Sequence, residues 1–208
     1  MRVNWRKFLF VFCMLQFCAL LVGCSAAWLG AVSALLPALE AAVSAAISFI
    51  VALEGKTVPP SVSAAIQKIG TDIATQITNV QALIASYQNA ASTGLLSQIQ
   101  AVFQGILTNL SSILSGFNVT DASTIAKLTQ LVGLAVAAVQ AILGLIPLVQ
   151  ARLAAGATKA ELEADDKFAA GQVKSFEKGL KEGYVSIVTT HTPNTDVNVA
   201  LDTLPRSL

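Results

Sequence analysis

The chain has 208 residues, of which 54% are hydrophobic and only 12% are charged, and its formal net charge is +1. Charged residues have about half their usual share, so most of the chain must be hidden from water. The near-neutral balance provides no basic field to hold phosphates, and we expect no nucleic-acid partner.

The first 23 residues have the features of a cleaved signal peptide. A basic start is followed by an apolar run over residues 8–22, interrupted only by Gln16; the three bases are Arg2, Arg6 and Lys7. This run is shorter than the roughly 20 residues that a helix needs to cross a bilayer. We therefore predict that residues 1–23 are removed. The alternative is a retained N-terminal anchor, with Cys24 an ordinary buried thiol.

The segment closes on Leu21-Val22-Gly23-Cys24. This pattern resembles the lipobox of bacterial lipoproteins. In that family the cysteine thiol is diacylated, the peptide is cut before it, and the new N-terminus is acylated. The resemblance therefore implies export and a lipid on Cys24. Ser25, rather than an aspartate, follows the cysteine, and in double-membraned bacteria this implies release to the outer membrane. The resemblance ends at about residue 25 and carries no further functional residues.

Cleavage would also change the chemistry of the chain. Cys13 and Cys18 lie in the discarded segment, so an acylated Cys24 leaves no free thiol and no disulfide. The formal charge moves to about −2, because 10 basic residues remain against 12 acidic ones. An exported domain of this kind must be held together by its core alone.

Residues 26–53 predict a helix that is apolar almost all round. Its polar positions recur in steps of 3 or 4 and form one narrow stripe: Ser33, Pro37, Glu40, Ser44 and Ser48. Such a helix lies at the centre of a bundle or in a membrane. Trp28 closely follows the predicted lipid site, so we expect its ring near lipid headgroups.

Two amphipathic helices are predicted next. Apolar residues recur every 3 or 4 positions from Val62 to Tyr87 and again from Leu95 to Phe117. A break over residues 89–94 predicts that the two form an antiparallel hairpin. Gly116 is expected to end the second helix, and Thr120 or Asp121 to cap the one that follows.

The helix predicted near residues 128–150 is again apolar on most sides. Small and polar residues share one line along it, a spacing that lets helix backbones approach closely; they are Gln130, Gly133, Ala137, Gln140 and Gly144. Residues 131–149 would span about 28 Å, close to the thickness of the hydrocarbon layer. Insertion of this helix and of 26–53 into the membrane is therefore an alternative, at the cost of burying Glu40.

The chain from Arg152 to Glu182 is highly charged, with six bases and six acids. It predicts a solvated last helix, started by a capping box of Thr158 and Glu161 and packed on the bundle. Residues 184–208 are expected to form a flexible tail or a small hairpin, with a strand over 184–188 and a turn at 192–195.

The residues provide no catalytic or metal constellation. His191 is the single histidine, and no thiol is left to pair with it, so we expect no metal site, no cofactor and no enzyme activity.

The sequence thus predicts an all-α bundle of four to five long helices over residues 24–183, with an irregular C-terminal tail. Its expected role is a structural or interaction module of the cell envelope, with the membrane as partner through the lipid on Cys24 and an envelope protein as a further partner. Two alternatives are a membrane-inserting or pore-forming protein, and a carrier of an apolar ligand held between helices.

Overall fold

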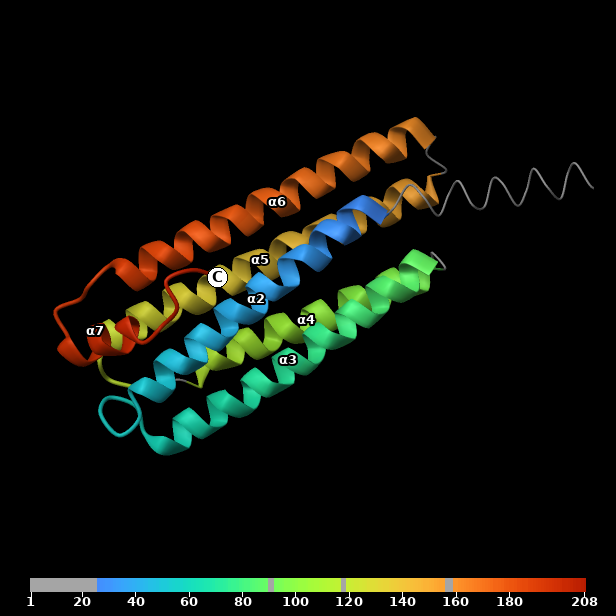
Figure 1. The fold of residues 1–208 in the computed structure, drawn as a ribbon. Helices are drawn as coiled ribbons and strands as arrows, with labels where there is room; N and C mark the ends of the chain where they lie inside the picture. The colour runs from blue at the N-terminus through green and yellow to red at the C-terminus, as the bar shows by residue number, and fades with distance from the viewer. Residues whose placement is uncertain (1–25, 90–91, 117–118, 156–158) are drawn as a thin grey trace, which may run out of the picture.

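Six helices make up most of residues 26–89, 92–116, 119–155 and 159–208, which are the parts that the computed structural model describes. They are α2 (Ala26–Ala52), α3 (Pro60–Asn89), α4 (Thr93–Ser115), α5 (Ala122–Ala154), α6 (Lys159–Thr189) and α7 (Thr195–Asp202). The five long helices run side by side and alternate in direction along the chain (Figure 1). The predicted all-α bundle is confirmed. The predicted signal peptide, Cys24 and Thr158 lie outside the described residues.

Helix α2 is the central helix, because it packs against α3, α5 and α6. Its leucines, its phenylalanine and most of its branched side chains are buried, and the predicted polar stripe, including Glu40, faces water. The ring of Trp28 is fully buried in the core. The expectation that Trp28 lies among lipid headgroups is therefore wrong: the bundle itself covers the ring.

Helices α3 and α4 form the predicted antiparallel hairpin and pack on each other. Most of the apolar positions predicted from the spacing of 3 or 4 are buried, while four are partly buried at the edge of the core: Val62, Ile69, Leu95 and Val102. The hydroxyl of Ser92 caps α4 by accepting a hydrogen bond from the Leu95 amide at 3.1 Å. Gly116 ends α4 as predicted. The side-chain amide of Asn109 donates a hydrogen bond of 3.1 Å to the side-chain oxygen Oε1 of Gln76, and this bond joins the two helices on their polar side.

The line of small residues on α5 does not mediate helix packing. A methyl group added at Gly133 or Gly144 would meet no neighbouring atom within 4 Å, and Ala137 and Gln140 are exposed. The expected close approach of helices along this line is wrong, because the side of α5 that carries Ala137, Gln140 and Gly144 is exposed and the core side lies elsewhere on the helix. Close approach occurs at Gly183, where a methyl group would crowd the side chain of Leu134.

The C-terminal segment is largely helical where a flexible tail or a small hairpin was expected. The predicted strand over 184–188 forms the last turns of α6, and the region 195–202 is α7. Val197 and Leu201 of α7 are buried, and the Tyr184 hydroxyl donates to the Pro205 carbonyl at 2.9 Å. The boundary placed before residue 184 is therefore wrong. Only the last few residues, after the C-cap at Thr203, form an irregular tail.

The burial of Ile73 gives a direct test of the core. Ile73→Asp would place an unpaired charge where the side chain is fully buried, and we expect a loss of about 4 kcal/mol or more in the free energy of unfolding. Urea unfolding followed by circular dichroism measures this loss. Thr75→Asp, on the exposed side of the same helix, is the control and should change the stability by about 0.5 kcal/mol or less. Equal stability of the two variants would show that this face of α3 is not core.

The open space beside Gly144 leads to the opposite expectation. Gly144→Ala should raise the free energy of unfolding by about 0.5–1 kcal/mol, since alanine restricts the unfolded chain and meets no neighbour in the folded one. Gly70→Ala is the contrasting variant, because its methyl group would overlap the side chain of Ile47 on α2. Destabilisation by Gly144→Ala would mean that this side of α5 packs against something.

Candidate functional site

A group of side-chain hydrogen bonds between distant parts of the chain lies at one end of the bundle. Four segments meet there: the loop after α2, the start of α5, the end of α6, and α7 (Figure 1). The loop turns at Gly55, whose φ of 76° suits glycine, and the Gly55 amide donates to the Val58 carbonyl at 2.9 Å. Buried Val58 holds this loop on the core. The four segments thus place their polar side chains around one site, which we call the polar end.

Asp121 is the central acceptor of the polar end. Its Oδ1 accepts hydrogen bonds of 2.7 Å from both the amide and the hydroxyl of Thr124, so it caps α5 as the sequence predicted. Its Oδ2 accepts a bond of 3.0 Å from the side-chain amide of Asn194. The bonds from Thr124, above all the one from its hydroxyl, lower the pKa of Asp121 below its ordinary value.

Asn194 links this cap to a second one. Its Oδ1 accepts from the amides of Asp196 and Val197 at 2.9 and 3.3 Å and so caps α7. The Thr57 hydroxyl lies 3.3 Å from that of Thr124. Because the Thr124 hydroxyl already donates to Asp121, Thr57 is the donor here. The N-caps of α5 and α7 and the loop after α2 are therefore joined in one chain of hydrogen bonds.

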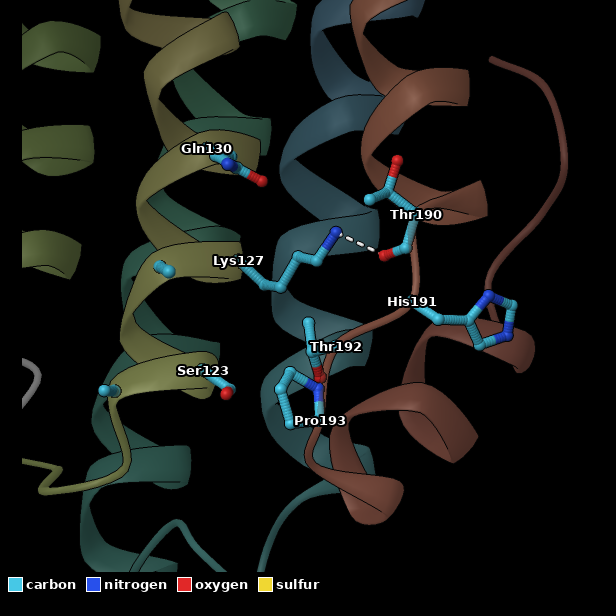
Figure 2. Close-up of a pocket in the computed structure, with 9 residues that line it drawn as sticks. Ser123, Lys127, Gln130, Thr190, His191, Thr192 and Pro193 are labelled. Carbon is cyan, nitrogen blue, oxygen red and sulfur yellow. Dashed lines mark hydrogen bonds between the residues drawn. The ribbon is translucent and has the colours of Figure 1, made fainter.

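Lys127 fixes the end of α6 from one turn further along α5. This lysine is 5% exposed, and its ammonium group donates to the carbonyls of Ile187 and Thr190 at 2.8 and 2.6 Å. Carbonyls at the end of a helix lack partners within the helix, and a cation suits them. Burial lowers the pKa of Lys127. Figure 2 shows the side chain reaching across from α5 to the Thr190 carbonyl.

An open pocket of about 350 Å³ lies beside this lysine, between the start of α5 and the segment after α6. Besides Lys127 its polar lining comes from Ser123, Gln130 and Thr192. His191 also borders it, but the side chain is exposed and its ring points away from Ser123 and Lys127 (Figure 2). Serine and histidine are therefore not arranged as nucleophile and base. The pocket is lined by hydroxyl and amide groups, while the ammonium group of Lys127 is already bonded to the carbonyls of Ile187 and Thr190.

Within the described ranges, no three histidine, cysteine, aspartate or glutamate side chains lie close enough to hold a metal ion. The predicted site residue Cys24 lies outside those ranges, so its lipid remains a prediction. Comparisons with protein-family models, with curated proteins and with solved structures found no match to this chain. The function must therefore be argued from the residues and their geometry.

Sequence reasoning finds one member of the polar end and misses the others. It predicts Asp121 as one of two candidate caps, the other being Thr120, whereas it assigns Asn194 to a turn and does not single out Lys127. A signal for Lys127 is present, since it is the single charged residue between Asp121 and Arg152. A lone charge in a long apolar helix needs a partner, but the sequence does not say that the partner is the end of α6.

The cap at Asp121 predicts a pH-dependent contribution to stability. Because its pKa is lowered in the folded protein, this contribution is present above the ordinary aspartate pKa of about 4 and is lost as the pH falls through the folded value. At pH 7, Asp121→Ala should cost about 1 kcal/mol, and at pH 2 this cost should shrink. Urea unfolding at both pH values provides the measurement.

The matched control is Asp202→Ala, which removes a half-exposed carboxylate paired with Arg206 and should change the stability by about 0.5 kcal/mol or less at either pH. An Asp121→Ala variant as stable as the parent at pH 7 would contradict the assigned cap.

Proposed function

We propose that this chain is a lipid-anchored protein of the bacterial cell envelope, attached through Cys24, and that the bundle is a non-enzymatic structural or interaction module at the membrane surface. Ser25 after the cysteine favours the outer membrane. The proposal rests on the lipobox pattern at the N-terminus and on where α2 begins. The membrane is one partner, and an envelope protein at the polar end is the second.

The observation that carries the proposal is the position of α2. The helix begins at Ala26, two residues after Cys24, and two residues of extended chain span at most about 7 Å. Helix α2 is also the central helix of the bundle. A lipid on Cys24 would therefore be connected to the core almost directly, and it would hold one end of a rigid body against the bilayer. Only residues 25–27 separate Cys24 from the buried Trp28, which is too short a segment to act as a flexible spacer.

The polar end supports an interaction role rather than a catalytic one. The acceptor oxygens of Asp121 and Asn194 are engaged by amides and hydroxyls of the protein itself. Lys127 is committed to two backbone carbonyls. These side chains hold helix ends in place, which leaves no obvious acid and base beside the pocket for chemistry on a substrate.

Membrane insertion is a second candidate with an observation in its favour. By length and composition, Trp28–Ala52 and Ala122–Ala151 are able to cross a membrane. The insertion of α2 would have to separate it from the three long helices that cover it and would place Glu40 in the hydrocarbon layer, at a cost of several kcal/mol. We therefore rank insertion below the surface-bound bundle.

Acylation of Cys24 is the first prediction to test. Expressed in a bacterium with labelled fatty acid, the chain should incorporate label and lose residues 1–23, as the mass of the purified protein would show. Cys24→Ala should remove the label and leave the precursor uncleaved, because the anchoring thiol is gone. Cys18→Ala is the control and should leave both unchanged. Labelling that persists in Cys24→Ala would overturn the proposal.

Leakage of a dye from phospholipid vesicles separates the two candidates. The surface-bound bundle predicts no leakage on addition of the purified full chain, whereas insertion predicts leakage that grows with protein concentration.

A further inference from the structure

Within the described residues, α5 and α6 expose four large apolar side chains, and two of them are much more exposed than Ile125 and Val185. Leu148 is 61% exposed and Phe168 is 62% exposed. The register of the two helices is set where Gly183 faces the side chain of Leu134. Leu148 follows Leu134 by 14 residues, and Phe168 precedes Gly183 by 15, which is about four helical turns in each case. The two exposed side chains therefore lie at about the same level along the bundle, one on each helix. We call them the Leu148–Phe168 pair.

This pair lies near the level at which α2 begins. At the polar end, Thr57 after α2 contacts Thr124 of α5, so the two helices share a common level there. From Thr124 to Leu148 the chain advances 24 residues, or about 36 Å, and the 27 residues of α2 extend over about 40 Å. Figure 1 shows the start of α2, the end of α5 and the start of α6 at the same end of the bundle.

We propose that the Leu148–Phe168 pair is a second membrane contact, inserted at the boundary between headgroups and acyl chains of the bilayer to which Cys24 is anchored. The inference rests on the proposed lipid anchor, which would hold this end of the bundle within about 7 Å of its attachment point. The partner is a phospholipid surface. With this second contact the bundle is tilted so that its α5–α6 side faces the bilayer, and its orientation is no longer free.

The α5 part of this side fits an apolar boundary, whereas on α6 Phe168 directly follows the charged residues Asp165, Asp166 and Lys167. Helix α5 carries no charged residue from 128 to 151, and its outward line consists of small and uncharged side chains. An aromatic and an aliphatic side chain more than half exposed to water gain free energy when they enter the interface. The proposed lipid on Cys24 would already hold this end of the bundle at the bilayer. The second contact would then form within one attached complex, without the entropy loss of a separate association.

Tryptophan fluorescence tests the contact. Phe168→Trp places a reporter in the pair, and Val199→Trp is the matched control, because Val199 is 51% exposed on α7 at the polar end. Each full chain is expressed with its signal segment, purified after processing and reconstituted in phosphatidylcholine vesicles, with or without bromine on the upper acyl chain. Emission of the parent chain, which contains the buried Trp28, is subtracted.

We expect brominated lipid to quench most of the reporter emission in Phe168→Trp and to leave the reporter in Val199→Trp unquenched. An unquenched Phe168→Trp chain whose mass includes the lipid would overturn the membrane contact and leave the anchor standing. A chain without lipid in its mass would overturn both. Equal quenching in the two variants would show that the bundle has no preferred side and would also overturn the contact. So would reporter emission in Phe168→Trp that changes with protein concentration but is not quenched, since this result would assign the pair to a second copy of the chain.

Discussion

The whole structure depends on the need to cover α2 on nearly all sides. This helix carries one charged residue, Glu40, and its large side chains are apolar around most of its circumference. Exposure of such an apolar surface to water is unfavourable in free energy. The neighbours of α2 must therefore pack apolar faces against it along its length. Helices α3, α5 and α6 do so, and α4 closes the remaining space by packing on α3 and α5. The three helices that cover α2 have 30, 33 and 31 residues, so each is long enough to extend along its 27 residues.

The same constraint explains the polar end. Helix α2 stops at Ala52, and the core residues Leu53 and Val58 just after it need cover. The short α7 packs against α2 and provides buried Val197 and Leu201. A helix of eight residues is not stable alone, and its start is fixed through Asn194 to the cap of α5. The hydrogen bonds of Asp121 therefore hold an apolar cover in place and are part of how the core is closed.

The sequence is sufficient for the long helices and insufficient for their ends. The apolar spacing predicts α3 and α4 closely, since a regular step of 3 or 4 has one structural solution over 20 or more residues. The segment 184–188 is assigned to a strand because it is rich in β-branched residues. It continues α6 instead, because Tyr184, Ile187 and Val188 keep the helical spacing from Leu180 and share its buried side. Packing decides where local preference is ambiguous.

Long-range contacts are beyond sequence reasoning for a different reason. Trp28 is expected near headgroups because of its distance from Cys24 along the chain, whereas its burial depends on helices that come later. The bond between Asp121 and Asn194 joins residues 73 apart, and no local pattern marks it. The line of small residues on α5 shows the same limit, because spacing predicts that residues share a side and not what that side faces.

Because the connection between Cys24 and α2 is short, a lipid on Cys24 would make the position of the polar end depend on the orientation of the bundle. If a lipid holds the start of α2, an upright bundle places the polar end about 40 Å from the bilayer, the length of the helix. A bundle that leans on Leu148 and Phe168 brings the same pocket and the same caps closer to the surface. A spacer of flexible residues would uncouple the two ends, but only residues 25–27 separate the cysteine from Trp28. The proposed tilt would therefore determine how far from the membrane the polar end meets a partner, and the two proposed contacts would be mechanically linked through α2.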